Sequence, residues 1–171
     1  MSAGSSSTHQ IKFGTDGWRG IIAEDFTFAN VCKVTRAIAA YLSTAYSQDR
    51  PVLVAYDPRF LADKFAHTAA EVLADLGWTV KIVDRDCPTP VIAYNARHLN
   101  SAGALMFTAS HNPAAYCGIK YIPDYAGPAT LAITDTIVAN LASASDAPPA
   151  KNNSGNISTF DPQPEYFKFI Y

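Results

Sequence analysis

The chain has no run of apolar residues near the ~20 that a membrane-spanning helix needs, which excludes that class of segment. A strong charge of one sign is also missing, because 13 Lys and Arg face 15 Asp and Glu for a formal net charge of −2. Binding to nucleic acid normally needs a basic surface, so we expect neither a nucleic acid nor a membrane as partner. Residues 1–10 are rich in serine and lack the basic and then apolar pattern of a secretory signal. We expect them to form a disordered leader.

Cysteine is scarce as well. Cys32, Cys87 and Cys117 are odd in number and far apart, which excludes a disulfide framework and a zinc-binding pattern. They favour a cytoplasmic location and buried side chains rather than reactive thiols. Acidic metal ligands are equally few, since Asp84 and Asp86 form the only Asp-x-Asp pair and an arginine separates them. We therefore expect a magnesium ion to take most of its ligands from outside this sequence.

What the sequence does contain is an alternation of short apolar runs and amphipathic stretches, which predict strands and helices. The predicted strands are 51–56, 78–83, 102–107 and 118–122. The predicted helices are 27–46, 61–76, 88–99 and 129–142. This order favours an α/β fold, a three-layer α/β/α domain with a mainly parallel mixed sheet. Right-handed crossovers then place the loops after Tyr56, Asp84 and Thr108 at one rim, where open sheets of this kind bind ligands.

The composition changes towards the C-terminus. Residues 11–146 are predicted to form the domain, and residues 147–164, rich in Ser, Ala, Asn and Pro, a linker. Residues 165–171 resemble the first turns of a helix that begins a second domain, with aromatic side chains left uncovered. We expect the chain to be the N-terminal part of a longer protein, and removal of this tail to leave its stability unchanged.

The most informative segment is 108–113, Thr-Ala-Ser-His-Asn-Pro, directly after the predicted strand 102–107. Ser110 is a candidate nucleophile that carries a phosphoryl group, and the alternative is a hydroxyl that caps the turn before Pro113. His111 is either a group that contacts a substrate hydroxyl or moves a proton, or an ordinary turn histidine.

A serine hydrolase is the main competing interpretation. The Gly-x-Ser-x-Gly motif of one large hydrolase class is absent around Ser110. Neighbouring side chains of extended backbone point to opposite sides, so we expect His111 to be badly placed as a base for Ser110. The other histidines, His9, His67 and His98, are expected to be surface or packed residues.

A second segment, residues 13–20, is Phe-Gly-Thr-Asp-Gly-Trp-Arg-Gly. Its glycines permit a backbone that approaches an anion closely, although the Gly-Lys-Ser/Thr of a P-loop is absent. Arg19 offers a guanidinium that matches phosphate geometry, and the alternative is a surface salt bridge.

Three further charged residues are candidates for this site. Lys120 follows the serine segment closely. It is either a group that does acid/base work or neutralises phosphate charge, or an ordinary edge-strand lysine. Asp57 and Arg59 follow a parallel strand, and either brace the serine loop or form an ordinary turn.

Residues 13–20, 108–113 and 118–120, in this order and spacing, resemble the first domain of the α-D-phosphohexomutases. That family includes phosphoglucomutase, phosphomannomutase and phosphoglucosamine mutase. The likeness runs from about residue 11 to residue 141.

The resemblance implies that Ser110 is phosphorylated and exchanges its phosphate with a hexose 1-phosphate or 6-phosphate through a hexose 1,6-bisphosphate. It implies that Mg²⁺ binds an oxygen of phosphorylated Ser110, that Lys120 and His111 do acid/base work and contact substrate, and that Arg19 lies near the phosphoserine. We expect contacts to phosphate or substrate from Thr15, Gly17, Arg19, Ser110, His111, Asn112 and Lys120.

The family's magnesium loop, sugar-discriminating loop and C-terminal phosphate loop have no counterpart in this sequence. We therefore expect the downstream domains to be required as partners, and the chain alone not to turn over hexose phosphates. Trp18 and Thr108 favour phosphoglucomutase or phosphomannomutase over phosphoglucosamine mutase. The alternative class is a non-catalytic module that binds a phosphosugar or a partner protein.

Overall fold

A computed structural model of the chain describes residues 11–153 and 156–171. The predicted leader, residues 1–10, lies outside the described residues. The centre of the fold is one six-stranded sheet in the order β1-β5-β4-β2-β3-β6. The strands are β1 Trp18–Ile21, β2 Val52–Tyr56, β3 Val80–Val83, β4 Ala104–Phe107, β5 Tyr116–Ile122 and β6 Ile157–Phe160. The neighbours β4, β2, β3 and β6 are parallel, whereas β5 is antiparallel to both β4 and β1. The mainly parallel mixed sheet is therefore confirmed.

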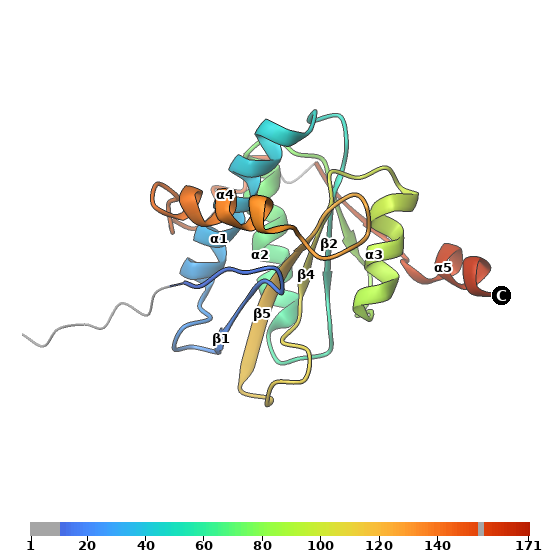
Figure 1. The fold of residues 1–171 in the computed structure, drawn as a ribbon, viewed down its shortest axis with the longest axis horizontal. Helices are drawn as coiled ribbons and strands as arrows, with labels where there is room; N and C mark the ends of the chain where they lie inside the picture. Colours follow the sequence, from blue (N-terminus) through green and yellow to red (C-terminus); the bar gives the residue numbers. More distant parts are fainter. Residues whose placement is uncertain (1–10, 154–155) are drawn as a thin grey trace, which may run out of the picture.

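Helices cover both faces of this sheet and complete the three predicted layers (Figure 1). The helices are α1 Phe28–Ala45, α2 Ala62–Asp75, α3 Thr89–His98, α4 Leu131–Leu141 and α5 Gln163–Ile170. The larger hydrophobic core lies under α1, α2 and α4, and a smaller one lies under α3. None of the helices in the described ranges has the length and apolar character required to cross a bilayer.

The predicted β2 shows why an apolar run without alternation becomes a central strand. Val52 and Val54 contribute to the larger core, and Leu53 and Ala55 contribute to the smaller one, because successive side chains point to opposite faces. A strand buried on both faces has no polar side to reveal its period.

The helix ends follow local chemistry that the sequence displays. Thr27 begins α1 as predicted, since its hydroxyl accepts a hydrogen bond from the Asn30 amide at 3.2 Å. Gly77 follows α2 with a φ of 90°, a left-handed conformation that glycine adopts without strain. Because β2, β3 and β4 are parallel, their C-terminal ends lie on the same side of the sheet. The loops after Tyr56, Asp84 and Thr108 therefore share a rim, as predicted.

Two strands differ from the sequence-based prediction. The end of the glycine-rich segment, residues 18–20, forms β1 together with Ile21 at the edge of the sheet, with Arg19 opposite Gly118 of β5. Residues 157–160 fall in the predicted linker 147–164, but they form β6, parallel to β3 with Val80 opposite Ile157. Both are short edge strands, which need little apolar sequence because one side has no neighbour.

The C-terminal segment is also more closely packed than predicted. The side chain of Asn95, buried in α3, donates a hydrogen bond to the Pro162 carbonyl at 2.8 Å. Tyr166 packs on the smaller core, and its ring lies 5.7 Å from that of Tyr94. Tyr166 is therefore partly covered, whereas the other large apolar side chains of the tail are exposed as predicted, namely Phe167, Phe169, Ile170 and Tyr171.

Candidate active site

The serine loop, residues 108–115, joins β4 to β5 at the rim described above. Ser110 in this loop is exposed to solvent. Its backbone has a φ of 56°, a left-handed conformation that is uncommon for a residue with a side chain. The Ser110 amide donates to the Thr108 hydroxyl at 2.9 Å, and the Thr108 amide donates to the Gly118 carbonyl at 3.0 Å. The loop thus presents one hydroxyl to solvent from a fixed backbone.

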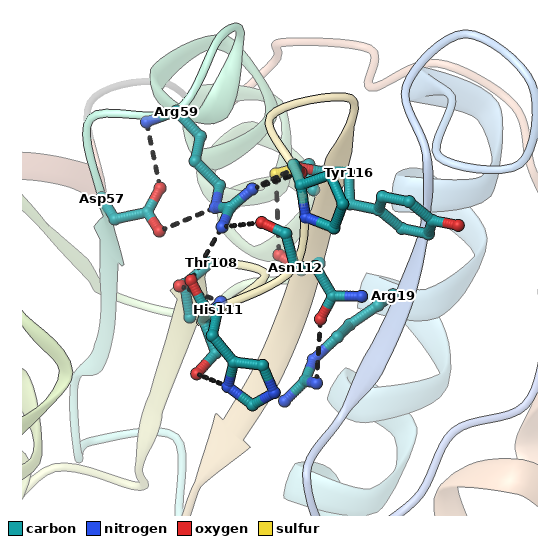
Figure 2. A network of polar contacts seen from close by, with 11 residues as sticks. Arg19, Asp57, Arg59, Thr108, His111, Asn112 and Tyr116 are labelled. Atoms are coloured by element: carbon teal, nitrogen blue, oxygen red, sulfur yellow. Dashed lines mark hydrogen bonds and ion pairs between the residues drawn. The ribbon is translucent and has the colours of Figure 1, made fainter.

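Arg59, just after β2, holds this loop in place (Figure 2). Its guanidinium donates to four loop and strand carbonyls at 2.7–3.0 Å, those of Ser110, Asn112, Pro113 and Tyr116. Asp57 lies 3.4 Å from Arg59 Nε and also accepts a hydrogen bond from the Arg59 amide at 3.1 Å. Of the two interpretations left open by the sequence, bracing of the serine loop is therefore the correct one.

His111 does not point away from Ser110. Its Nδ1 lies 3.4 Å from Ser110 Oγ, a long contact at the limit for a hydrogen bond. The prediction that neighbouring side chains diverge is wrong because it assumes extended backbone, whereas Ser110 is left-handed. His111 can therefore exchange a proton with the serine hydroxyl or with a group bound to it.

Arg19 and Lys120 both lie beside the carboxylate of Asp16, a residue that no sequence motif indicated. Asp16 Oδ2 lies 3.7 Å from Arg19 Nη2, and Asp16 Oδ1 lies 3.8 Å from Lys120 Nζ. Arg19 Nη1 donates to the Asn112 side chain at 3.1 Å, which ties this cluster to the serine loop (Figure 2). The structure therefore brings Arg19, Lys120 and Asn112 together. A carboxylate three residues before an arginine in a glycine-rich turn is the sequence signal available for Asp16.

Glycines allow β1 to come this close. A side chain at Gly118 would lie 2.6 Å from the Thr108 carbonyl oxygen and 2.8 Å from that of Trp18. Gly17 has a φ of 83°, and a Cβ there would collide with the Ile119 carbonyl oxygen. Its conformational freedom serves the turn into β1, and the phosphate contact expected of Gly17 stays a prediction.

Thr15 lines a pocket with a volume of about 300 Å³. Asp16 and Lys120 also line the pocket, which extends to Thr89 at the start of α3 and to Gly127. Thr15 is thus near Lys120 but is not among the residues that contact the serine loop in the described part of the chain.

The remaining candidates are structural. Cys32, Cys87 and Cys117 are free and buried as predicted, and burial raises the pKa of the Cys87 and Cys117 thiols to about 12. They are therefore protonated and not nucleophilic at neutral pH. His67 and His98 lie on α2 and α3, where His67 contacts its own helix backbone, and His9 lies outside the described residues.

Within residues 11–153 and 156–171, no three His, Cys, Asp or Glu side chains gather as a metal site would require. The Asp84 carboxylate instead pairs with Arg85 at 3.0 Å. Where a magnesium ion would find its ligands therefore stays a prediction.

Comparison with known proteins identifies this arrangement. A family model described as phosphoglucomutase/phosphomannomutase, alpha/beta/alpha domain I, matches residues 10–148. A phosphoglucomutase of Staphylococcus saprophyticus is 37% identical over 120 residues, which cover 68% of this chain and 22% of that protein. A phosphoglucomutase of Staphylococcus aureus strain bovine RF122 is 37% identical over 117 residues, or 65% of this chain and 20% of that protein. The chain thus spans about a fifth of the length of these relatives.

Solved structures agree on the fold. A candidate phosphomannomutase from Thermus thermophilus superposes with a TM-score of 0.82 and 35% identity, over 92% of this chain and 35% of that one. The phosphoglucomutase parafusin from Paramecium superposes with a TM-score of 0.70 at 20% identity, over 80% of this chain and 27% of that one, which supports the fold alone. With the matched residues spanning the serine loop, β1 and Lys120, the chain belongs to the phosphoglucomutase/phosphomannomutase family, as an α/β/α domain I.

Proposed function

We propose that this chain supplies the phosphate-carrying serine of a phosphohexomutase that interconverts a hexose 1-phosphate and a hexose 6-phosphate. In this proposal Ser110 is phosphorylated and transfers its phosphoryl group to the free hydroxyl of the substrate. The bond from phosphorus to Ser110 Oγ breaks as a bond to the sugar oxygen forms, and the resulting hexose 1,6-bisphosphate returns its other phosphate to Ser110. The observation that carries the proposal is an exposed, rigidly held Ser110 whose loop is tied to the Arg19, Asp16 and Lys120 cluster.

The charges fit phosphoryl transfer, in which positioning and neutralisation of the phosphate dominate catalysis. Arg19 and Lys120 bring two positive charges to the loop, and Asp16 is the carboxylate that now lies between them. His111 is the candidate to accept the proton that leaves the sugar hydroxyl, whereas protonated Lys120 is the candidate to donate a proton to Ser110 Oγ as its bond to phosphorus breaks. We expect substrate contacts from Thr15, Gly17 and Asn112 on the same side.

Mg²⁺ remains part of this proposal only through the phosphate itself. An oxygen of phosphorylated Ser110 would be one ligand, and the described residues do not assemble the others. For that reason, and because no counterpart of a sugar-selecting loop occurs in the sequence, we expect no turnover from the 171 residues alone. Without that loop, the sugar of the substrate can equally be glucose or mannose, and glucosamine is a less favoured alternative.

A chimaera tests the proposal. In this chimaera, residues 10–148 of the chain replace the corresponding segment of the Staphylococcus saprophyticus phosphoglucomutase. Conversion of glucose 1-phosphate to glucose 6-phosphate is then measured in the presence of Mg²⁺ and glucose 1,6-bisphosphate. We expect turnover, and a phosphate on Ser110 in the intact mass. Ser110→Ala should abolish both, whereas Ser47→Ala, an exposed serine before β2, should change neither.

The 3.4 Å contact between Ser110 Oγ and His111 Nδ1 keeps a serine hydrolase as the second candidate. A fluorophosphonate probe that labels Ser110, together with a failure of hexose bisphosphate to phosphorylate it, would favour the hydrolase. A folded chimaera that binds hexose phosphate but shows neither activity would favour a non-catalytic module.

A further inference from the structure

The guanidinium of Arg59 directs both of its terminal nitrogens to the backbone of the serine loop and β5. An arginine side chain carries five N–H groups and no acceptor. The two on Nη2 point to the Ser110 and Asn112 carbonyls, both at 2.7 Å, and those on Nη1 serve Pro113 at 2.9 Å and Tyr116 at 3.0 Å. The Asp57 carboxylate lies 3.4 Å from Nε. The four N–H groups of Nη1 and Nη2 are therefore all committed to backbone carbonyls, and Nε faces the Asp57 carboxylate.

Arg19 differs in this respect. Its Nη1 serves the Asn112 side chain, its Nη2 reaches Asp16 only at 3.7 Å, and its buried Nε has no hydrogen-bond partner in the described part of the chain. The two arginines beside the serine loop therefore have different capacities. Arg19 retains donors for an anion, whereas Arg59 is committed to the backbone (Figure 2).

The backbone contacts of Arg59 bear directly on Ser110. A left-handed conformation costs a residue with a side chain on the order of 1–3 kcal/mol and persists only where surrounding contacts enforce it. Here the Ser110 amide is held by the Thr108 hydroxyl and its carbonyl by Arg59. The Ser110 carbonyl and the His111 N–H belong to one trans peptide unit, so they point in opposite directions. The hydrogen bond from Arg59 to this carbonyl therefore fixes the orientation of the whole peptide unit between Ser110 and His111.

We propose that Arg59 is a positioning residue for phosphoryl transfer, which holds the serine loop beside Arg19 and fixes the backbone that presents Ser110, without itself binding phosphate. This inference rests on the proposed function of Ser110. In this proposal the Asp57 carboxylate, 3.4 Å from Arg59 Nε, keeps the guanidinium in its orientation. Four carbonyls around one guanidinium need a planar fork, so a lysine, with a compact ammonium and three donors, cannot replace Arg59.

The protein offers a matched control. Arg50, before β2, also donates to two backbone carbonyls, those of Asn100 and Ser101, and pairs with Asp124 at 3.1 Å. Its side chain is 23% exposed, compared with 15% for Arg59. Arg50→Lys therefore removes a similar backbone clamp away from the serine loop, and any general loss of stability should appear in both variants.

The first measurement is hydrogen exchange on the 171-residue chain. Arg59→Lys should speed exchange of the loop amides of Ser110, Asn112 and Tyr116 by about tenfold or more, since charge-assisted hydrogen bonds to the loop are lost. Arg50→Lys should leave these amides unchanged. Where Arg59→Lys fails to fold, Asp57→Asn replaces it and should give a smaller change in the same direction. Loop exchange no faster than in Arg50→Lys would overturn the proposal.

The second measurement separates positioning from mere stability. Phosphoserine is incorporated at position 110 during translation, and its ³¹P chemical shift is compared with that of a phosphopeptide spanning residues 104–118. We expect the folded chain to show a displaced signal, Arg59→Lys to lose most of that displacement, and Arg50→Lys to keep it. A displacement that survives Arg59→Lys, or one absent from the unsubstituted chain, would overturn the proposal. Neither measurement involves a sugar, so failure of the chimaera to turn over hexose phosphate would count against the proposed function alone.

Discussion

Asp16 is the residue whose charge bears most directly on the two cations of the candidate site. Its side chain is 78% exposed and lies between Arg19 and Lys120. An exposed ion pair contributes little stability, on the order of 0.2–1 kcal/mol, so this carboxylate can be displaced at small cost. An incoming phosphate would therefore compete with the Asp16 carboxylate for Arg19 and Lys120.

We expect Asp16→Asn to tighten binding of inorganic phosphate to the chain by up to about fivefold, because removal of the carboxylate leaves Arg19 and Lys120 without their counter-charge. The affinity is measured by titration calorimetry at low ionic strength. Asp63→Asn is the control, since Asp63 is also an exposed partner of a lysine, Lys64, but lies on α2. Equal affinities in Asp16→Asn and Asp63→Asn would show that Asp16 does not compete with anions.

Gly17 makes a second prediction at the scale of one residue. Gly17→Ala should lower the free energy of unfolding by more than about 2 kcal/mol, because it combines a φ of 83° with a Cβ that collides with the Ile119 carbonyl oxygen. Gly14→Ala is the matched control in the same turn, where a Cβ would meet nothing within 4 Å. Urea unfolding of the two variants gives the comparison. Similar losses in both would mean that β1 can move away from β5.

The sequence predicts the chemistry of the site better than its contacts. Ser110, Arg19 and Lys120 are apparent as residue types suited to phosphate, and the exposure of Ser110 agrees with the role expected of it. The brace by Arg59 and the link through Asp16 join residues far apart in the chain, and no local pattern carries such a contact. The Ser110–His111 geometry escapes prediction because the backbone conformation of one residue decides it.

At the scale of elements, α5 is held to the rest of the molecule by one face. Tyr166 is partly buried against the smaller core and contacts Tyr94, whereas Tyr171 is fully exposed. These contacts favour a tail whose removal costs stability, although its other large apolar side chains stay exposed as expected. The strand β6 strengthens this conclusion, because it covers the edge of β3.

We therefore expect Tyr166→Ala to lower the melting temperature by several degrees, through lost burial and lost aromatic contact on the order of 1–3 kcal/mol. Tyr171→Ala should leave it unchanged, since that side chain has no burial to lose. Removal of residues 148–171 should cost more than Tyr166→Ala alone, because β6 is lost too. Thermal unfolding followed by circular dichroism provides the test, and an unchanged melting temperature on truncation would restore the view of a detached tail.

The elements also show where sequence patterns succeed. Elements with a clear boundary signal, such as Thr27 before α1 and Gly77 after α2, agree with the prediction to within a few residues. Both missed strands, β1 and β6, have four residues each and lie at the edges of the sheet. Their pairing partners, not their own composition, make them strands.

For the molecule as a whole, buried thiols and phenols predict alkaline sensitivity. Burial raises the pKa of Cys87, Cys117 and Tyr41 to about 12, above the ordinary values of 9.0 and 10.0. The folded state therefore keeps protons that the unfolded state releases. The stability they contribute is fully present below about pH 9 and is lost as the pH rises towards 12.

We expect the free energy of unfolding to fall steadily above about pH 9, and a double variant, Cys87→Ala with Cys117→Ala, to show a shallower decline although it is less stable at neutral pH. Urea unfolding at a series of pH values measures the slope. Cys32→Ala is a weaker control, since burial raises the Cys32 pKa but Arg36 opposes the shift. Parallel slopes for the double variant and the unsubstituted protein would exclude the two thiols as its source.

The position of β1 beside β5 has a consequence for synthesis on the ribosome. Residues 18–21 leave the exit tunnel early, but their hydrogen-bonding neighbour, residues 116–119, is translated roughly 100 residues later. At about 5–20 residues per second, this strand waits on the order of 5–20 seconds for its partner. The hydrogen bond from Arg19 to Asn112 therefore forms only after most of the 171 residues have been translated. In a nascent chain released before that point, Arg19 would lie on a strand that has no pairing partner.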